Sequence, residues 1–291
     1  MLVSFIFLFL RLRTLPLKSI LKFLVSTFAM ITFNLPVLAK EIVTFNNGSL
    51  ELKGELFKPE GKGPFPVLLI NHGSAPGMLN SQASAAIAAP FVKRGWVVFM
   101  PYRRGQGLSH ESGPYIMDEI KKSINEGGLP SGVKTLVRLN QTDHLSDQRA
   151  ALKWIQTQSY IKIDQIAAFG NSFGGIQTML GVTNGGYCAG VNAAGGAKSW
   201  SKAKPLQELM KEAARSTKVP VMFFQAENDF DLSPSKTLYQ LMKDLNKDAV
   251  FKIYPPFGKT AKEGHSFPYE GVDTWFEDVF SFISERCLAP H

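Results

Sequence analysis

The sequence has 291 residues, of which 45% are hydrophobic and 19% charged, with 32 basic against 24 acidic side chains. This length allows one large α/β domain or two small ones. The ordinary composition excludes a disordered chain, a collagen-like repeat and a disulfide scaffold. The formal charge of +8 raises nucleic acid or a membrane surface as partners, so we follow its distribution along the chain.

The first 39 residues have the pattern of a secretory signal peptide. Their charged residues are Arg11, Arg13, Lys18 and Lys22, all basic, and an apolar run over 23–37 follows before Ala39. A basic region, an apolar region and small residues at the cut are typical of such signals. Removing 39 of 291 residues leaves 252, and removing four of the eight excess positive charges leaves +4. The sequence therefore predicts an exported protein, periplasmic or secreted, with no stable membrane partner once the signal is removed.

Two alternatives remain for this segment. Residues 20–38 are nearly long enough to span a bilayer, so the segment could stay as an uncleaved anchor. An apolar run over 1–10 precedes the basic residues, which is also compatible with a true start near Leu17. Sequencing the N-terminus of the mature protein distinguishes these alternatives.

Short apolar runs alternate with helical stretches through the rest of the chain, which predicts one domain over residues 40–291. The predicted strands are 41–45, 50–57, 66–71, 96–100, 165–169, 190–194, 219–225 and 250–254, the first two joined as a hairpin. The predicted helices are 81–94, 147–158, 173–182, 203–215, 234–245 and 272–285. Such alternation favours an α/β fold, with a mostly parallel twisted sheet of about eight strands and helices on both faces.

One segment interrupts the alternation. Residues 108–142 are polar, Gly-rich and weakly periodic where a short connection would be expected. We predict an irregular, cap-like insertion near the pocket there, because loops at the ligand-binding edge of such a sheet set specificity.

The motif over 170–175, Gly-Asn-Ser-Phe-Gly-Gly, lies between a predicted strand and a predicted helix. A serine on such a tight turn projects its hydroxyl from the sheet edge, and the flanking glycines let neighbouring backbone pass. Free N–H groups at the start of the helix can bind an anionic intermediate. Ser172 is therefore the candidate nucleophile.

A serine nucleophile needs a base and a carboxylate that orients the base. His265 follows the last predicted strand and is expected on a loop at the ligand-binding edge of the sheet. The acid candidates follow the strand 219–225: Asp229 is favoured, and Asp231 and Glu227 are the alternatives. Asp231 could instead cap the helix that begins near Pro234.

With these motifs the chain resembles the α/β-hydrolases, and among them the dienelactone hydrolase-like enzymes, over nearly all of 40–291. The stretches that carry the resemblance are 63–73, 102–109, the motif around Ser172, 227–229 and 264–265. The resemblance implies a triad of Ser172, Asp229 and His265. It also implies an oxyanion hole formed by the backbone N–H of Phe173 and of Ser74, with Ala75 as the alternative to Ser74 because Pro76 has no N–H.

Other conspicuous residues have structural interpretations. Arg103 and Arg104 could bind a substrate carboxylate, although the resemblance favours support of a loop. Asp147 is interpreted as a charge at the start of its helix. Cys188 and Cys287 match no metal motif; they form either one disulfide or two free thiols.

The sequence thus predicts an exported serine hydrolase that cleaves small carboxylic esters through an acyl-enzyme, with no cofactor and no metal. No phosphate-binding loop and no aromatic-interleaved basic stripe is present, which argues against nucleic acid as a partner. A prolyl oligopeptidase-like peptidase, an acyltransferase and a non-catalytic binding module are the alternatives. The sequence does not indicate which ester is the substrate.

Overall fold

The computed structural model describes residues 39–74 and 81–289. The predicted signal peptide, with the exception of Ala39, lies outside the described residues, as do its anchor alternative and Ala75. The described residues form one compact unit in their contact pattern. Among the described helices, none is both long and apolar enough to cross a membrane.

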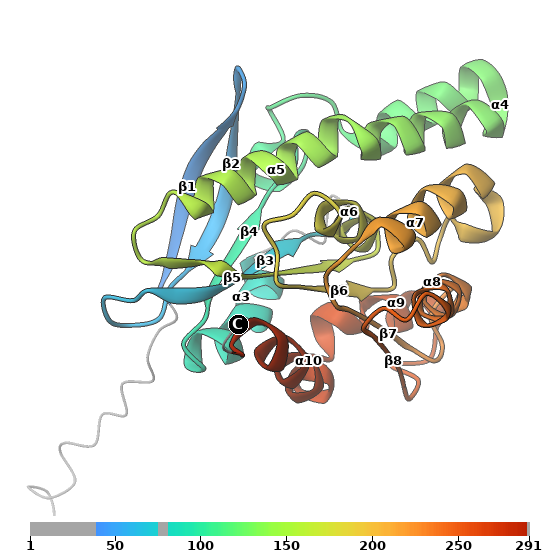
Figure 1. Cartoon of the computed structure of the whole chain (residues 1–291). Helices are drawn as coiled ribbons and strands as arrows, with labels where there is room; N and C mark the ends of the chain where they lie inside the picture. The colour runs from blue at the N-terminus through green and yellow to red at the C-terminus, as the bar shows by residue number, and fades with distance from the viewer. Residues whose placement is uncertain (1–38, 75–80, 290–291) are drawn as a thin grey trace, which may run out of the picture. The chain divides into compact units, whose positions relative to one another are not determined.

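Eight strands form one sheet (Figure 1). They are β1 (Lys40–Asn47), β2 (Leu50–Phe57), β3 (Phe65–Asn71), β4 (Val97–Pro101), β5 (Ile161–Asn171), β6 (Ala189–Ala193), β7 (Val221–Ala226) and β8 (Ala249–Tyr254). Their order across the sheet is β1-β2-β4-β3-β5-β6-β7-β8. The hairpin β1–β2 and the pair β2–β4 are antiparallel, and every other pair is parallel. The predicted α/β fold with a mostly parallel sheet is therefore confirmed.

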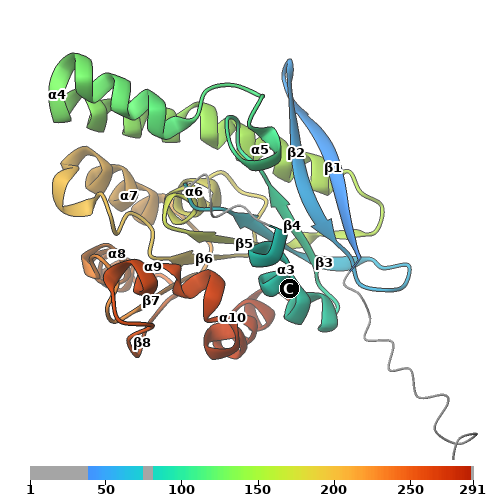
Figure 2. The same cartoon turned by 180° about the vertical axis from the view of Figure 1, so that it is seen from behind.

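Helices cover both faces of this sheet. Successive side chains of each strand point to opposite faces, and on each face they pack with the helices into one apolar cluster. Along β3, Leu69 belongs to one cluster and Leu68 to the other. The helices on the first face are α4 (Ile116–Gln141), α5 (Asp143–Gln156), α6 (Phe173–Val182), α7 (Lys204–Ser216) and α8 (Ser233–Asp244). Those on the second face are α3 (Ser81–Lys93), α9 (Ala261–Glu270) and α10 (Val272–Cys287), as Figure 2 shows.

The prediction of an irregular segment over 108–142 is wrong for most of its length. Gly127 and Gly128 have non-helical backbone angles, so α4 consists of two helical arms. The Ser123 and Thr135 hydroxyl oxygens are 2.7 Å apart, whereas 12 residues of straight helix would separate them by about 18 Å. The insertion is therefore an antiparallel helical hairpin, hereafter the α4 hairpin.

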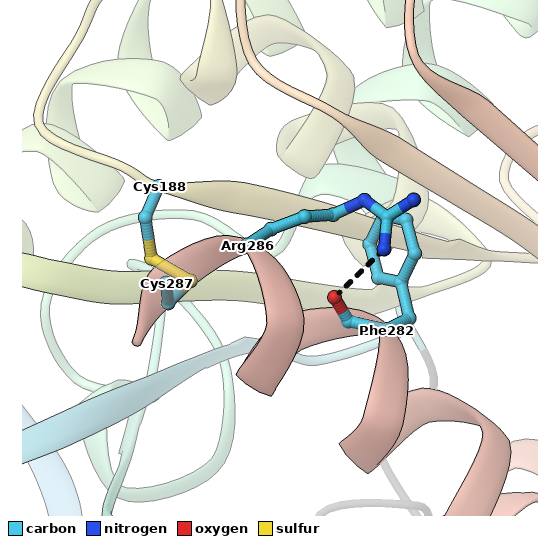
Figure 3. Close-up of a disulfide and its surroundings, with 4 residues drawn as sticks. All are labelled: Cys188, Phe282, Arg286 and Cys287. Carbon is cyan, nitrogen blue, oxygen red and sulfur yellow. Dashed lines mark hydrogen bonds between the residues drawn. A yellow bond between two sulfur atoms is a disulfide. The ribbon is translucent and has the colours of Figure 1, made fainter. Parts of the chain in front are cut away.

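A disulfide joins the start of β6 to the end of α10. Cys188 and Cys287 are bonded (Figure 3), across a sequence separation of 99 residues. Next to the bridge, the Arg286 guanidinium lies 4.2 Å from the centre of the Phe282 ring and donates to the Phe282 carbonyl. Of the two alternatives for the cysteines, the structure has the disulfide, which attaches the last helix to the edge of the sheet where parallel strands begin.

Candidate active site

The predicted site residues all lie beyond the carboxyl ends of the parallel strands. Ser172 follows β5 directly, Asp229 follows β7, and His265 comes after β8. In open parallel sheets this edge is where ligands bind, because connecting loops from several strands converge there. The topology thus brings together three side chains separated by up to 93 residues.

Ser172, the predicted nucleophile, has a strained backbone in the turn between β5 and α6. Its φ of 56° and ψ of −114° are sparsely populated for a non-glycine residue and cost about 1–3 kcal/mol. Close packing holds the turn: a Cβ on Gly174 would lie 1.7 Å from the carbonyl oxygen of Asn71. The Ser172 N–H donates to the carbonyl of Ala193 on β6 at 2.9 Å. The hydroxyl is therefore presented at the start of α6, as the sequence motif predicts.

His265 lies in a helix, not on a loop as predicted. Helix α9 begins with a capping box in which the Thr260 hydroxyl accepts from the Glu263 N–H, and the Glu263 carboxylate accepts from the Thr260 N–H. The Thr-x-x-Glu spacing is the local signal that could have revealed this helix start. The helix also packs tightly on the loop that carries Asp229, since a Cβ on Gly264 would lie 2.6 Å from Asn228 Oδ1.

One chain of hydrogen bonds joins the three predicted residues. His265 Nδ1 lies 2.8 Å from Asp229 Oδ1, and His265 Nε2 lies 2.9 Å from Ser172 Oγ. A carboxylate only accepts, so Nδ1 carries the imidazole proton and Nε2 is free to accept the serine proton. His265 is 5% exposed and Asp229 9% exposed, so both are largely shielded from water.

Asp229 is held from two further sides. Its Oδ1 also accepts from the Phe230 N–H at 2.6 Å, and its Oδ2 accepts from Gln225 Nε2 at 3.0 Å. Asp231 does not reach the histidine; its Oδ1 accepts from the Ser233 N–H at 2.8 Å, at the start of α8. The geometry thus agrees with Asp229 as the partner of His265. Asp231 binds one free N–H at the start of α8, but the N-cap residue of that helix is Leu232 and not Asp231. Glu227 is exposed.

An exposed aromatic ring borders this chain of hydrogen bonds. Phe230 is 43% exposed, and its ring meets the His265 ring edge-on at 5.2 Å between centroids. The Lys198 ammonium lies 4.8 Å from the centre of the same ring. Lys198 also borders an apolar groove of about 160 Å³ between the α4 hairpin and residues 198–203. Sequence reasoning did not identify Phe230 or Lys198, because neither belongs to a recognisable motif.

The segment after β3 lies next to the serine. A Cβ on Gly73 would be 3.7 Å from the Cβ of Ser172, and the Ser74 carbonyl accepts from the Tyr115 hydroxyl at 3.1 Å. Phe173 is the first residue of α6, so its N–H is one of the groups that the helix leaves unpaired. Of the predicted oxyanion donors, Phe173 thus directly follows Ser172 at the start of α6, and Ser74 follows Gly73, which lies beside Ser172.

The two arginines after β4 are both held by protein groups. Arg104 forms an ion pair with Asp147 at 2.7 Å, which raises the pKa of the arginine. Asp147 is 2% exposed and lies within α5, not at its start as predicted, because α5 begins at Asp143. Arg103 is 3% exposed and donates to the backbone before Ser74. Both side chains support loops at the site. Over the described ranges, no group of three or more His, Cys, Asp or Glu side chains could hold a metal ion.

Comparison with known structures shows the same fold in several enzymes. An acylaminoacyl peptidase of Pyrococcus horikoshii aligns with a TM-score of 0.64 at 18% identity, over 87% of this chain and 42% of the peptidase. An esterase of Pyrococcus furiosus aligns with a TM-score of 0.61 at 14% identity, over 87% of this chain and 92% of the esterase. A Klebsiella pneumoniae protein named as a dienelactone hydrolase aligns with a TM-score of 0.58 at 15% identity, over 83% and 99%.

This chain thus spans less than half of the peptidase and nearly the whole of the other two proteins. No curated protein matches the sequence. The family model described as "Dienelactone hydrolase family" matches residues 52–278, which include every predicted site residue. The chain therefore belongs to the dienelactone hydrolase family, within the α/β-hydrolase fold.

Proposed function

We propose that this protein is a serine hydrolase that cleaves carboxylic esters of small molecules. The observation that supports this function best is the continuous chain of hydrogen bonds from Asp229 through His265 to Ser172. A hydroxyl bonded to a neutral imidazole, which is itself oriented by a buried carboxylate, is the arrangement that activates serine for acyl transfer. Membership of a hydrolase family agrees with this chemistry.

The reaction follows from these roles. Ser172 Oγ attacks the acyl carbon while its proton moves to His265 Nε2, and the carbonyl oxygen becomes an oxyanion. The tetrahedral intermediate then breaks its bond to the alkoxy oxygen, which leaves as the alcohol with the proton from Nε2. Water then attacks the acyl-enzyme and gives a proton to Nε2. The second tetrahedral intermediate breaks its bond to Ser172 Oγ, which takes the proton back from Nε2, and the carboxylic acid is released. Asp229 stabilises the imidazolium that forms twice in each cycle.

Backbone N–H groups are the proposed oxyanion donors. The Phe173 N–H lies at the positive end of the α6 dipole, and the Ser74 N–H belongs to the segment beside Ser172. Donors of this kind contribute about 10²–10³ each to the rate, because they are aimed at charge that develops only in the transition state.

Export is part of the proposal. It is supported by the signal-like pattern of residues 1–39 and by the disulfide between Cys188 and Cys287, since disulfides persist mainly in oxidising compartments. The N-terminal sequence of the protein recovered outside the cytoplasm should begin at Lys40. A mature chain that still begins at Met1 contradicts cleavage.

The test of the catalytic proposal compares the parent with Ser172→Ala. The parent should hydrolyse p-nitrophenyl esters and react covalently with a fluorophosphonate, whereas Ser172→Ala should fold normally and do neither. Ser201→Ala, which removes an exposed hydroxyl, is the matched control and should keep both properties. Ester hydrolysis by Ser172→Ala at the parent's rate contradicts the proposal. A parent that neither turns over esters nor reacts with the probe favours the binding-module alternative.

Peptidase activity is the second candidate, because the peptidase of Pyrococcus horikoshii shares this fold. Because an esterase and a peptidase would both use the proposed triad, only the substrate that the protein cleaves distinguishes the two candidates. Parallel assays with p-nitrophenyl esters of graded acyl length and with peptide anilides, each with Ser172→Ala as the blank, decide between the two. We expect turnover of the esters only.

A further inference from the structure

Three buried side chains form hydrogen bonds with the backbone of residues 72–73, directly before the proposed oxyanion donor Ser74. They are His72, Arg103 and Tyr269, with exposed fractions of 0%, 3% and 5%. None of them has a role in the acyl-transfer steps above. They hold the backbone of this segment through the bonds described below, so they can affect the geometry of the second oxyanion donor. The Tyr269 hydroxyl also interacts with the side chain of Asn171, directly before Ser172. The inference that follows rests on the proposed function.

The hydrogen bonds of His72 define its protonation. Its Nε2 accepts from the Arg103 backbone N–H at 3.1 Å, so the imidazole proton is on Nδ1. Nδ1 therefore donates to the carbonyl oxygen of Gly73, at 2.6 Å. Burial holds the pKa of His72 well below its usual range, and the charge of Arg103 lowers it further. His72 is thus a neutral donor to the Gly73 carbonyl.

Arg103 places a positive charge against the same carbonyl groups. Its Nη2 donates to the His72 carbonyl at 2.7 Å and to the Gly73 carbonyl at 3.3 Å. Burial lowers the pKa of the Arg103 guanidinium to about 10, so it remains charged at neutral pH. In the described part of the chain, no carboxylate forms an ion pair with it, whereas the neighbouring Arg104 is paired with Asp147.

These bonds orient the Gly73–Ser74 peptide. In a trans peptide the C=O and N–H point in opposite directions. Since His72 and Arg103 hold the Gly73 C=O, the Ser74 N–H points away from both of them. The Gly73 N–H is already used, because it donates to the Tyr269 hydroxyl at 2.8 Å. Of the two N–H groups, that of Ser74 is therefore the one left for an oxyanion.

Tyr269 also connects this segment to the base. It lies four residues after His265 in α9, and residues four apart share one face of a helix. One rigid element therefore carries both the group that removes the proton from Ser172 and the group that holds Gly73. A shift of α9 would move the base and the oxyanion segment together.

We propose that His72, Arg103 and Tyr269 are positioning residues: they hold the Gly73–Ser74 peptide so that the Ser74 N–H meets the oxyanion, and Tyr269 couples that peptide to the helix of the base. The effect on catalysis is exerted through Ser74, since none of the three touches the reacting atoms. Loss of one oxyanion donor lowers kcat about 10²–10³-fold, so a donor that is misaimed rather than removed should cost about 10- to 100-fold.

The test uses two variants of the full-length protein, Tyr269→Phe and Arg103→Met. Both should lower kcat for a p-nitrophenyl ester, and the rate constant of fluorophosphonate labelling at Ser172, by about 10- to 100-fold with KM changed less than threefold. The midpoint of the pH–rate profile should stay where it is in the parent, because the contacts of His265 are intact. Arg103→Lys, which keeps a buried cation, should recover part of the loss.

Tyr187→Phe is the matched control. It also removes a buried hydroxyl, one that accepts from Gln148 at 3.2 Å before β6, and it should label and turn over within about twofold of the parent. Folding of every variant is checked by thermal unfolding. If Arg103→Met does not fold, Tyr269→Phe decides the test alone, because it removes a single oxygen atom.

Three results overturn the inference. If Tyr269→Phe labels and turns over as fast as Tyr187→Phe, the Tyr269 hydroxyl does not position the Ser74 N–H. A shifted pH midpoint shows that the residue acts through the base. A parent that does not label at Ser172 refutes the proposed function itself, and with it this inference, whereas the first two results leave that function standing.

Discussion

Replacing Asp229 with asparagine tests the proposed triad at its buried end. The carboxylate accepts three hydrogen bonds, from His265 Nδ1 and the Phe230 N–H at Oδ1 and from Gln225 Nε2 at Oδ2. An amide has one acceptor oxygen and two N–H donors, so in either orientation its nitrogen faces a donor. If the amide nitrogen faces His265, the imidazole proton must move to Nε2, which can then no longer accept the serine proton.

The size of the effect follows from these two orientations. The wrong histidine tautomer in a serine triad lowers kcat by about 10⁴, or about 5.4 kcal/mol at 1.36 kcal/mol per tenfold. In the other orientation the tautomer survives, but the imidazolium loses the negative charge beside it and Gln225 loses its acceptor. We therefore expect kcat to fall by about 10³–10⁴, with about 1–3 kcal/mol lost from the free energy of unfolding because one buried donor is left unpaired.

The assay is steady-state hydrolysis of the p-nitrophenyl ester that the parent cleaves fastest, together with thermal unfolding. Asp231→Asn is the matched control, because the same substitution two residues away removes only a carboxylate at the start of α8. It should keep kcat within about twofold, since a hydrogen bond to the first N–H of a helix contributes to stability and not to proton transfer. The reasoning is refuted if Asp229→Asn keeps more than a tenth of the parent's kcat, or if Asp231→Asn loses as much.

Three further predictions concern stability. The denatured, unreduced parent should contain no free thiol, and Cys287→Ala should lower the free energy of unfolding in urea by about 2–5 kcal/mol; an unchanged value contradicts a stabilising disulfide. Arg104→Ala leaves the Asp147 carboxylate, 2% exposed, without its cation, and should lower the free energy of unfolding by about 3–5 kcal/mol in the same assay. A loss of less than about 1 kcal/mol would show that the ion pair does not stabilise the fold. Burial lowers the pKa of His144 from 6.5 to about 2. Between these values the unfolded chain binds one more proton, so stability should fall as pH drops below 6.5, by up to about 1.4 kcal/mol per pH unit for this residue. His144→Phe should remove that part of the slope, and an unchanged slope between pH 4.5 and 6.5 contradicts it.

The fold was accessible from local patterns because the strands of a covered parallel sheet are continuous apolar runs. β3 and β7 are buried along almost their whole length, and their sequences are almost entirely apolar. Two helices were missed. In the α4 hairpin, Gly127, Gly128 and Pro130 interrupt the periodicity, and in α9 a glycine and a proline obscured a helix that its capping box indicates.

The candidate site, like the fold, could be predicted from the sequence only in part. The serine motif between a strand and a helix, and the order of acid before histidine, are local features, and they named Ser172, Asp229 and His265 as candidates. Their catalytic roles stay predictions that the variants above test. Which of Asp229 and Asp231 faces the histidine depends on how the chain turns after β7, so two aspartates two residues apart could not be separated with certainty from the sequence.

The sequence by itself determined the class of fold, the family resemblance and the short list of reactive residues, because strand periodicity, turn chemistry and motif spacing act over a few neighbouring residues. Only the tertiary structure decided the pairing of Cys188 with Cys287 and the contacts of Arg103 and Tyr269 with the segment beside Ser172. These contacts join residues that are 30 or more positions apart. They depend on the order and register of the strands, and that arrangement is set by packing of the whole core rather than by local sequence.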